Sequence, residues 1–304
     1  MKSASRPASQ LVAHPYLLLT LTALFWSGNM VMGRGLRADV PPIALAFWRW
    51  TIAFLLVLPF AWRELRSQWP LLRAAWRPVL LLGLLGVGGY NTFAYLALQH
   101  TTATSAALIN SFIPVATVAF AMLLFGKRLL RHEASGVLIS MLGVLTIVSQ
   151  GSLQVLFGLS LNTGDLWMLA AVTSWGLYTA GLQRRPAGVS PMPLLATFTL
   201  IGLAALAPAY AWELGSGRHI EFSTASVLGI LYTGIFPGFL GYVFYNAGVA
   251  AVGPARASLF IHLMPVFSIL LAAIFLGERP LWYHFVGIAL VFAGIFLTTR
   301  KPGG

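Results

Sequence analysis

The sequence predicts an all-α polytopic membrane protein in which ten transmembrane helices form two inverted five-helix repeats. Three observations predict this fold class: the apolar composition, a set of long apolar runs, and an internal repeat. Hydrophobic residues make up 58% of the 304 residues, charged residues make up 9%, and the mean hydropathy is +0.82. A soluble domain carries about 25% charged residues. This chain therefore cannot cover itself with a polar surface.

Ten apolar runs are long enough to cross a bilayer, which takes roughly 20 mostly apolar residues. The runs are continuous and do not alternate with polar residues, so they favour helices, which satisfy their own backbone hydrogen bonds in lipid. We expect spans at 16–33, 41–62, 78–98, 102–125, 134–150, 165–183, 192–212, 225–247, 257–276 and 281–299.

Lysine and arginine are distributed unevenly between the segments that join these spans. If the N-terminus is inside, 14 of the 19 cationic residues fall in inner segments and 4 in outer segments, while Arg49 alone lies within a span. Because positive charge concentrates on the cytoplasmic side, both chain ends are expected inside. The net charge of +12 is then a topology signal, and no nucleic-acid partner is expected.

The chain repeats itself after 151 residues, which predicts one repeat over 1–150 and a second over 151–304. With a two-residue adjustment upstream, Trp26 also pairs with Trp175. Apolar matches would be common by chance in such a sequence, but the repeat also matches glycine, proline and arginine. The matched pairs include Gly83 and Gly234, Pro114 and Pro265, Gly126 and Gly277, Arg128 and Arg279, Gly136 and Gly287, and Gly143 and Gly294.

Each repeat holds five spans, an odd number, so the second must enter the membrane from the opposite side. Lys127 and Arg128 then lie inside, whereas the equivalent Glu278 and Arg279 lie outside and carry one positive charge fewer. Inverted repeats of this kind are common in secondary transporters, whose substrate site lies near the midplane between the repeats.

Two matched features interrupt the helices of both repeats. Pro114 and Pro265 each remove a backbone hydrogen bond within a span. They act either as packing kinks or as hinges that line the site. The glycine clusters at 83–89 and 234–241 serve either close helix packing or a flexible gate.

Several short motifs recur within this framework. Each repeat closes with a proline, eleven residues, a Gly-[Lys/Glu]-Arg triplet and a final helix with spaced glycines. The stretches WSGN (26–29) and WGLY (175–178) occupy the first and sixth spans. Over 16–299 this pattern resembles the EamA-type members of the drug/metabolite transporter superfamily, most closely the bacterial aromatic-amino-acid exporters. The resemblance implies a metabolite or amino-acid exporter of the bacterial inner membrane.

Polar and aromatic residues in the middle of spans are the candidate substrate-binding residues, because an unpaired polar group is costly in lipid. The alternative for each is hydrogen bonding between helices. Their matched placement in both repeats favours a shared cavity suited to an aromatic or apolar molecule. We expect Tyr90, Asn91, Tyr242 and His262 to line one water-filled cavity. The full set is Trp26, Asn29, Tyr90, Asn91, Tyr95, Asn110, Ser111, Trp175, Tyr178, Tyr242, Tyr245, Asn246 and His262.

Two ionisable side chains within spans leave alternatives open. Arg49, flanked by Trp48 and Trp50, lies some eight residues into the second span. It either reaches the membrane interface or a structural partner, or it faces the cavity and pairs with a substrate carboxylate. His262 is either a hydrogen-bonded interior residue or a proton carrier. The seven acidic residues all fall in loops or at span ends, so the sequence leaves the coupling ion open.

The motifs of other membrane-protein classes do not occur. The chain has no cysteine, no phosphate-binding loop and no H-E-x-x-H or G-x-S-x-G motif. We therefore expect no enzyme activity, metal or cofactor. The sequence predicts a monomer whose partners are a small-molecule substrate and the lipid bilayer. The favoured function is export of aromatic or bulky apolar amino acids by alternating access. A drug or other metabolite carrier and a membrane channel are the alternatives.

Overall fold

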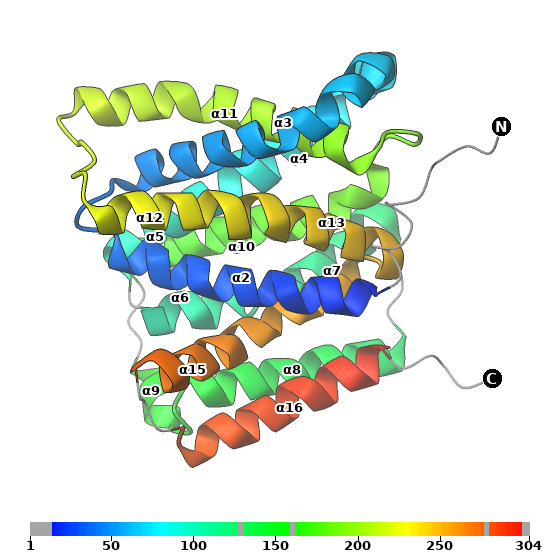
Figure 1. Cartoon of the computed structure of the whole chain (residues 1–304). Coiled ribbons are helices and arrows are strands. Elements are labelled where there is room, and N and C mark those ends of the chain that lie inside the picture. Colours follow the sequence, from blue (N-terminus) through cyan, green and yellow to red (C-terminus); the bar gives the residue numbers. More distant parts are fainter. Residues whose placement is uncertain (1–13, 102, 127–129, 159–161, 277–279, 300–304) are drawn as a thin grey trace.

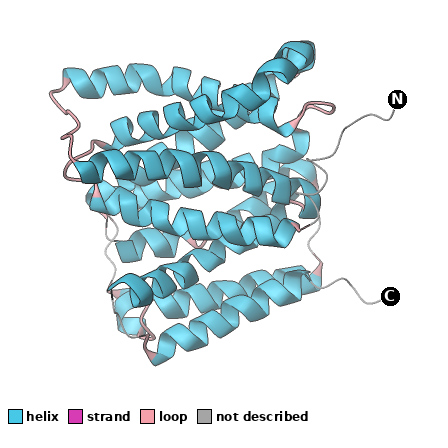
Figure 2. Ribbon diagram, in the orientation of Figure 1, coloured by secondary structure: helices cyan, strands magenta, loops and turns pink. Residues whose placement is uncertain are grey.

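The computed structural model describes residues 14–101, 103–126, 130–158, 162–276 and 280–299, and these residues form a stack of helices (Figures 1 and 2). The labels follow Figure 1. The first repeat contains α2 (Pro15–Gly35), α3 (Pro42–Ala74), α4 (Trp76–Gly83), η1 (Leu84–Gly89), α5 (Tyr90–His100), α6 (Ala103–Asn110), α7 (Ile113–Phe125), α8 (Arg131–Val148) and the short α9 (Leu153–Phe157).

The second repeat follows the same order. It contains α10 (Thr163–Gly181), η2 (Leu182–Arg184), α11 (Pro191–Gly215), α12 (Thr224–Thr233), η3 (Gly234–Leu240), α13 (Gly241–Val252), α14 (Pro254–Leu259), η4 (Phe260–His262), α15 (Leu263–Leu276) and α16 (Trp282–Thr299). The N-terminal end of α2 and the C-terminal end of α16 lie on the same side of the stack, at the right in Figure 1. We call this side the termini face.

Nine stretches of the described residues are long and apolar enough to cross a membrane. They coincide with nine of the ten predicted spans. The predicted sixth span is α10, a helix of 19 residues that is less apolar because it carries several polar side chains and packs inside the stack against α5, α7 and η1. The second span extends further than predicted, because α3 continues to Ala74 through a segment that carries Arg63, Arg66 and Arg73.

Residues 151 positions apart contact each other at two points in the structure. Nδ2 of Asn91 donates to the hydroxyl of Tyr242 at 3.2 Å, and Nε2 of His262 bonds the carbonyl oxygen of Ser111 at 2.8 Å. A residue can touch its own repeat equivalent only close to the axis that relates the two copies. These contacts therefore locate the pseudo-two-fold axis of the inverted repeats.

Some of the matched positions cannot be placed. Lys127, Arg128, Gly277, Glu278 and Arg279 lie outside the described residues. Both matched prolines follow a break in a span: α6 ends before Pro114, and the 3₁₀ turn η4 ends shortly before Pro265. Whether either proline acts as a hinge stays a prediction.

The matched glycine clusters form π-helical segments, η1 and η3. Single π-helical turns inside α-helices are rare and frequent at functional sites. Side chains of the opposite repeat donate hydrogen bonds to carbonyl groups of both segments: Ser174 to Leu85 at 2.8 Å, Tyr242 to Gly86, and Trp26 to Pro237 at 3.1 Å. A Cβ on Gly86 would lie 2.5 Å from the Tyr178 ring, so this cluster also permits close packing.

The last helices of the two repeats, α8 and α16, pack against each other in opposite directions through glycine. Gly136 faces Gly294, and Gly143 faces Gly287. A Cβ on Gly143 would lie 2.6 Å from the carbonyl oxygen of Gly287 and 2.8 Å from the amide nitrogen of Val291. Because these atoms belong to the backbone, the helices can admit a methyl group only by moving apart.

The variant Gly143→Ala is expected to lower the free energy of unfolding by about 1–3 kcal/mol, the usual range for overpacking. Thermal unfolding of the purified protein in detergent measures this loss. Gly215→Ala is the matched control, because a Cβ at the end of α11 would meet no atom within 4 Å. An equal effect of the two substitutions would contradict the proposed packing of α8 on α16.

Candidate functional site

A cavity of about 610 Å³ lies between the two repeats. The first repeat contributes residues from α2, α5, α6 and α8 to its lining, and the second contributes residues from α10, η4, α15 and α16. Most of the lining is aliphatic or methionine, with Met30, Met168 and Met264 among it. The volume and the apolar walls match those of pockets for small organic molecules.

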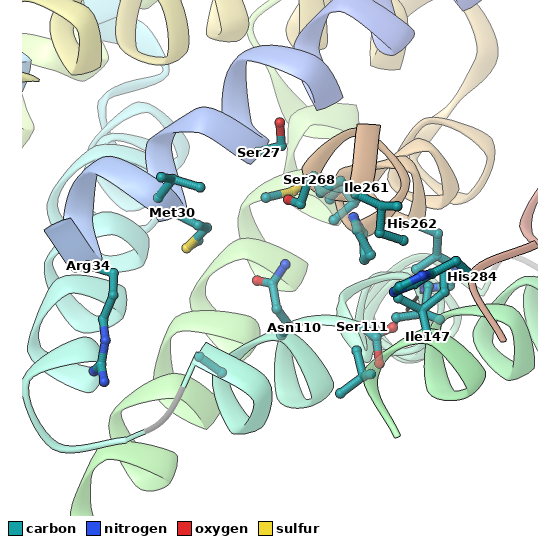
Figure 3. Close-up of a pocket in the computed structure, with 18 of the residues that line it drawn as sticks. Ser27, Met30, Arg34, Asn110, Ser111, Ile147, Ile261, His262, Ser268 and His284 are labelled. Carbon is teal, nitrogen blue, oxygen red and sulfur yellow. Dashed lines mark hydrogen bonds between the residues drawn. The ribbon is translucent and has the colours of Figure 1, made fainter. Parts of the chain in front are cut away.

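One face of α2 defines the depth of this cavity. Ser27, Met30 and Arg34 line it at helical spacing (Figure 3). Seven residues along a helix correspond to roughly 10 Å. The cavity also reaches Gly35, the last residue of α2, and Gln150, which lies two residues after the end of α8. These helix ends lie opposite the termini face, so the cavity extends from the centre of the stack toward that opposite face.

The inner end of the cavity, which we call the floor, is formed by the two breaks in α6–α7 and in η4–α15. Ser111 and His262 line it from the two repeats. Because a carbonyl oxygen can only accept, Nε2 of His262 donates to Ser111, and Nδ1 bonds the hydroxyl of Ser140 at 2.8 Å. Both ring nitrogens of His262 are therefore used in contacts between the repeats.

Next to the cavity, on the other side of α2, the structure buries the cation of Arg49. Only 1% of this residue is exposed. Its Nη1 donates to Asn29 at 3.0 Å, to Tyr95 at 3.0 Å and to Asn91. Within the described ranges, Arg49 forms no ion pair with a carboxylate, and its Nε has no hydrogen-bond partner. Arg49 therefore does not reach the membrane interface but joins α2, α3 and α5 through neutral acceptors.

Buried aromatic rings fill the space between the two repeats beside Arg49. Trp26 and Trp175, which the repeat pairs, meet edge to face with ring centroids 4.9 Å apart. Tyr242 packs edge to face on Trp175 at 5.3 Å and on Trp50 at 4.7 Å. We call this group, with Tyr90, Tyr178 and Tyr245, the aromatic core. It lies beside the cavity, because Trp26 precedes the lining residue Ser27 in α2 and Tyr90 bonds the lining residue Asn110.

An ion pair joins the repeats nearer the termini face. Nε of Arg256 lies 3.2 Å from Oε1 of Glu133, which connects the start of α8 to α14. Both residues line a smaller hollow of about 370 Å³ together with residues of α7 and the 252–256 turn. The smaller hollow therefore lies nearer the termini face, whereas the cavity extends toward the opposite face.

A comparison with known protein families shows which family has this sequence pattern and architecture. Residues 14–149 and 162–300 each match the model of the EamA-like transporter family. The chain belongs to this family. It is a multi-pass membrane protein and a membrane transporter, and the two matches correspond to the two inverted repeats.

Relatives of this EamA-family protein cover nearly its whole length. An uncharacterized transporter of Archaeoglobus fulgidus is 28% identical over 94% of this chain and 97% of its own. The uncharacterized transporter YyaM of Bacillus subtilis is 24% identical over 92% of each chain. A probable terminal-alkyne amino-acid exporter of Streptantibioticus cattleyicolor is 26% identical over 74% of each chain. A protein solved by crystallography shares the fold, with a TM-score of 0.76, 21% identity, and coverage of 94% of this chain and 96% of that one.

The structure divides the candidate residues of this EamA-family protein between two places. Asn110, Ser111, His262 and Pro265 line the cavity. The sequence predicts that Tyr90, Asn91 and Tyr242 share a water-filled cavity with His262. In the structure these three side chains are buried and do not line the cavity, and their part in substrate binding stays a prediction. The residues that do not line it are Trp26, Asn29, Tyr90, Asn91, Tyr95, Pro114, Trp175, Tyr178, Tyr242, Tyr245 and Asn246.

Several lining residues escaped the sequence analysis. Met30 and Ser268 lie within predicted spans but were not candidates, and Arg34 was counted with the cations of the outer segments. The seven-residue spacing of Ser27 and Arg34 on one face of α2 is the signal that could have found them.

The variant Asn29→Leu is expected to lower the free energy of unfolding by about 2 kcal/mol or more, because the buried cation of Arg49 loses an acceptor. Adding Arg49→Met removes the charge that needs this acceptor, so the double variant should recover part of the loss. Thermal unfolding of the single and double variants measures this coupling. Thr20→Val on the same helix is the control, since Thr20 bonds the carbonyl of Tyr16 in its own helix. Purely additive losses would contradict the role of Asn29.

Proposed function

We propose that this EamA-family protein is a secondary transporter that exports amino acids with aromatic or bulky apolar side chains by alternating access. The observation that carries the proposal is the cavity of about 610 Å³ between the two repeats, which extends toward one face and ends at the floor formed by Ser111 and His262. A carrier needs such a site between two halves that rock against each other. The name of the Streptantibioticus cattleyicolor relative, an amino-acid exporter, supports the substrate class.

The chemistry of the lining also supports this substrate class over cationic drugs. Methionine and aliphatic side chains adapt to bulky apolar groups. None of the acidic residues that the structure describes lines the cavity, so a cationic drug finds no carboxylate there among the described positions. A carrier of neutral drugs or other metabolites is the second candidate. A channel is the third candidate, and the contact between the repeats at the cavity floor, where His262 bonds Ser111, disfavours it.

The orientation follows from the charge distribution. We place both chain ends on the cytoplasmic side of a bacterial inner membrane. The cavity then faces the outside of the cell, and the Glu133–Arg256 ion pair lies on the cytoplasmic side. We assign the repeats to residues 1–150 and 151–304. The site is built from the two repeats of one chain, so the protein works as a monomer with a small-molecule substrate.

Transport by the purified protein in liposomes tests the function. Labelled L-phenylalanine should enter with saturation, and unlabelled L-phenylalanine inside should accelerate its entry. Ala107→Phe should abolish this uptake because Ala107 lines the cavity and a ring would fill it. Leu123→Phe is the control, since Leu123 is 79% exposed on the surface of α7. Uptake without saturation would indicate a channel, and uptake of drugs without any amino acid would indicate the second candidate.

Cysteine labelling in intact bacterial cells tests the orientation. The chain has no cysteine, so each introduced thiol is unique. Ser268→Cys should react with a membrane-impermeant maleimide from outside, because Ser268 lines the cavity. Thr117→Cys is the matched control: it is the repeat equivalent of Ser268 and is fully buried. Labelling of the Ser268 variant only after the cells are permeabilised would reverse the proposed orientation.

A further inference from the structure

The amide nitrogen of Asn110 faces the cavity without a hydrogen-bond partner among the described residues. Asn110 is 7% exposed and lines the cavity at the end of α6. Its Oδ1 accepts a hydrogen bond from the hydroxyl of Tyr90 at 2.9 Å. Nδ2 of Asn110 forms no hydrogen bond with any residue that the structure describes. In Figure 3 the amide points away from its own helix, toward the space between Met30 and Ser268.

Tyr90 determines which end of this amide faces the ligand. Tyr90 is buried behind the cavity wall, and its hydroxyl engages the oxygen of Asn110. The nitrogen with its two hydrogens is then left for the cavity. A buried polar group without a partner is costly, so the position is suited to a ligand that supplies an acceptor.

A hydrogen bond between the repeats fixes the floor beside Asn110. Nε2 of His262 donates to the carbonyl oxygen of Ser111 at 2.8 Å, and Ser111 directly follows Asn110 in the chain. His262 therefore holds the end of α6, which carries Asn110, against the second repeat.

A full positive charge lies further toward the mouth. Arg34 lines the cavity, and its Nη1 donates to the carbonyl groups of Leu98 and Thr101, both at 3.0 Å. These two bonds fix the guanidinium at the end of α5. Of the seven acidic residues, Glu278 lies outside the described residues, and none of the others lines the cavity. The positive charge of Arg34 is therefore not balanced by a carboxylate in the described lining.

We propose that the cavity recognises its substrate by a carboxylate, which accepts hydrogen bonds from the amide of Asn110 at the floor and lies in the positive potential of Arg34. Tyr90 is a positioning residue that holds the Asn110 nitrogen toward the carboxylate. The apolar part of the substrate packs against the methionine and aliphatic walls. This inference rests on the proposed function and specifies its substrate class as carboxylates.

Two pairs of probes test this carboxylate recognition on the purified full-length protein. L-Phenylalanine is compared with L-phenylalaninol, and 3-phenylpropanoate with 3-phenylpropanol, so each pair differs in the carboxylate. Dissociation constants come from calorimetry. Each acid should bind about tenfold or more tightly than its alcohol, the ratio expected for a hydrogen bond to a charged group. Asn110→Leu should remove this ratio, and Asn110→Asp should reverse it in favour of the cation phenylalaninol.

Substitution of Tyr90 tests its positioning role. Tyr90→Phe removes only the hydroxyl that fixes the amide, so the acid-to-alcohol ratio should fall although no cavity atom is lost. Tyr95→Phe is the matched control, because its hydroxyl bonds Asn29 and Arg49 behind the wall. It should lower the thermal unfolding temperature and leave the ratio unchanged. Folding of every variant is checked by thermal unfolding in the same detergent.

The outcomes separate this inference from the proposed function. Equal binding of acids and alcohols, with amino-acid transport intact, would overturn carboxylate recognition alone. Selective binding of 3-phenylpropanoate without transport of any amino acid would overturn the proposed function alone. If the Asn110→Leu and Tyr90→Phe variants fold and keep the wild-type preference for the acid over its alcohol, Asn110 is not the residue that binds the carboxylate. Failure of both acids to bind would overturn the inference.

Discussion

Hydrogen bonds exchanged between the two repeats at their π-helical segments hold the central structure together. In lipid, a backbone carbonyl that loses its helical partner must find another donor within the protein. Here the indole nitrogen of Trp26 in the first repeat donates to the carbonyl oxygen of Pro237 in the second. The hydroxyl of Tyr242 in the second repeat donates to the carbonyl oxygen of Gly86 in the first. Each repeat thus donates hydrogen bonds to the π-helical backbone of the other. These two hydrogen bonds fix Trp26 and Tyr242 within the aromatic core.

The buried cation of Arg49 depends on the same arrangement. A charge in the interior is tolerated only when several polar groups surround it. Asn29, Asn91 and Tyr95 supply neutral acceptors, and Asn91 in turn bonds Tyr242 across the axis. The cation is therefore connected to the contact between the repeats. A movement of α13 against α5 would disturb its environment, which links the position of the repeats to the energy of a buried charge.

The sequence predicts the helices and the repeat well, because apolar length and glycine placement are local properties of the chain. It predicts the site less well for two physical reasons. Tyr90 and Asn110 are both polar residues in the middle of a span. Only the packing of the helices decides that Asn110 lines the cavity while Tyr90 lies behind its wall. For Arg49 the sequence leaves two environments open, the membrane interface or a structural partner on one hand and the substrate cavity on the other, because the flanking tryptophans are compatible with both. The extension of α3 to Ala74 was missed because arginine-rich segments next to a span read equally as loop.

The repeat equivalents of the cavity residues show how one chain can form two opposite-facing sites. Pro265 and Ser268 line the cavity, whereas their equivalents Pro114 and Thr117 are buried in α7. His284 lines the cavity near its mouth, whereas its equivalent Glu133 lines the smaller hollow and pairs with Arg256. The two repeats thus hold equivalent positions in different environments. If they exchange environments during transport, Thr117, whose buried hydroxyl has no hydrogen-bond partner, takes the place that Ser268 now occupies. The asymmetry of the present structure is then the difference between the two ends of the transport cycle.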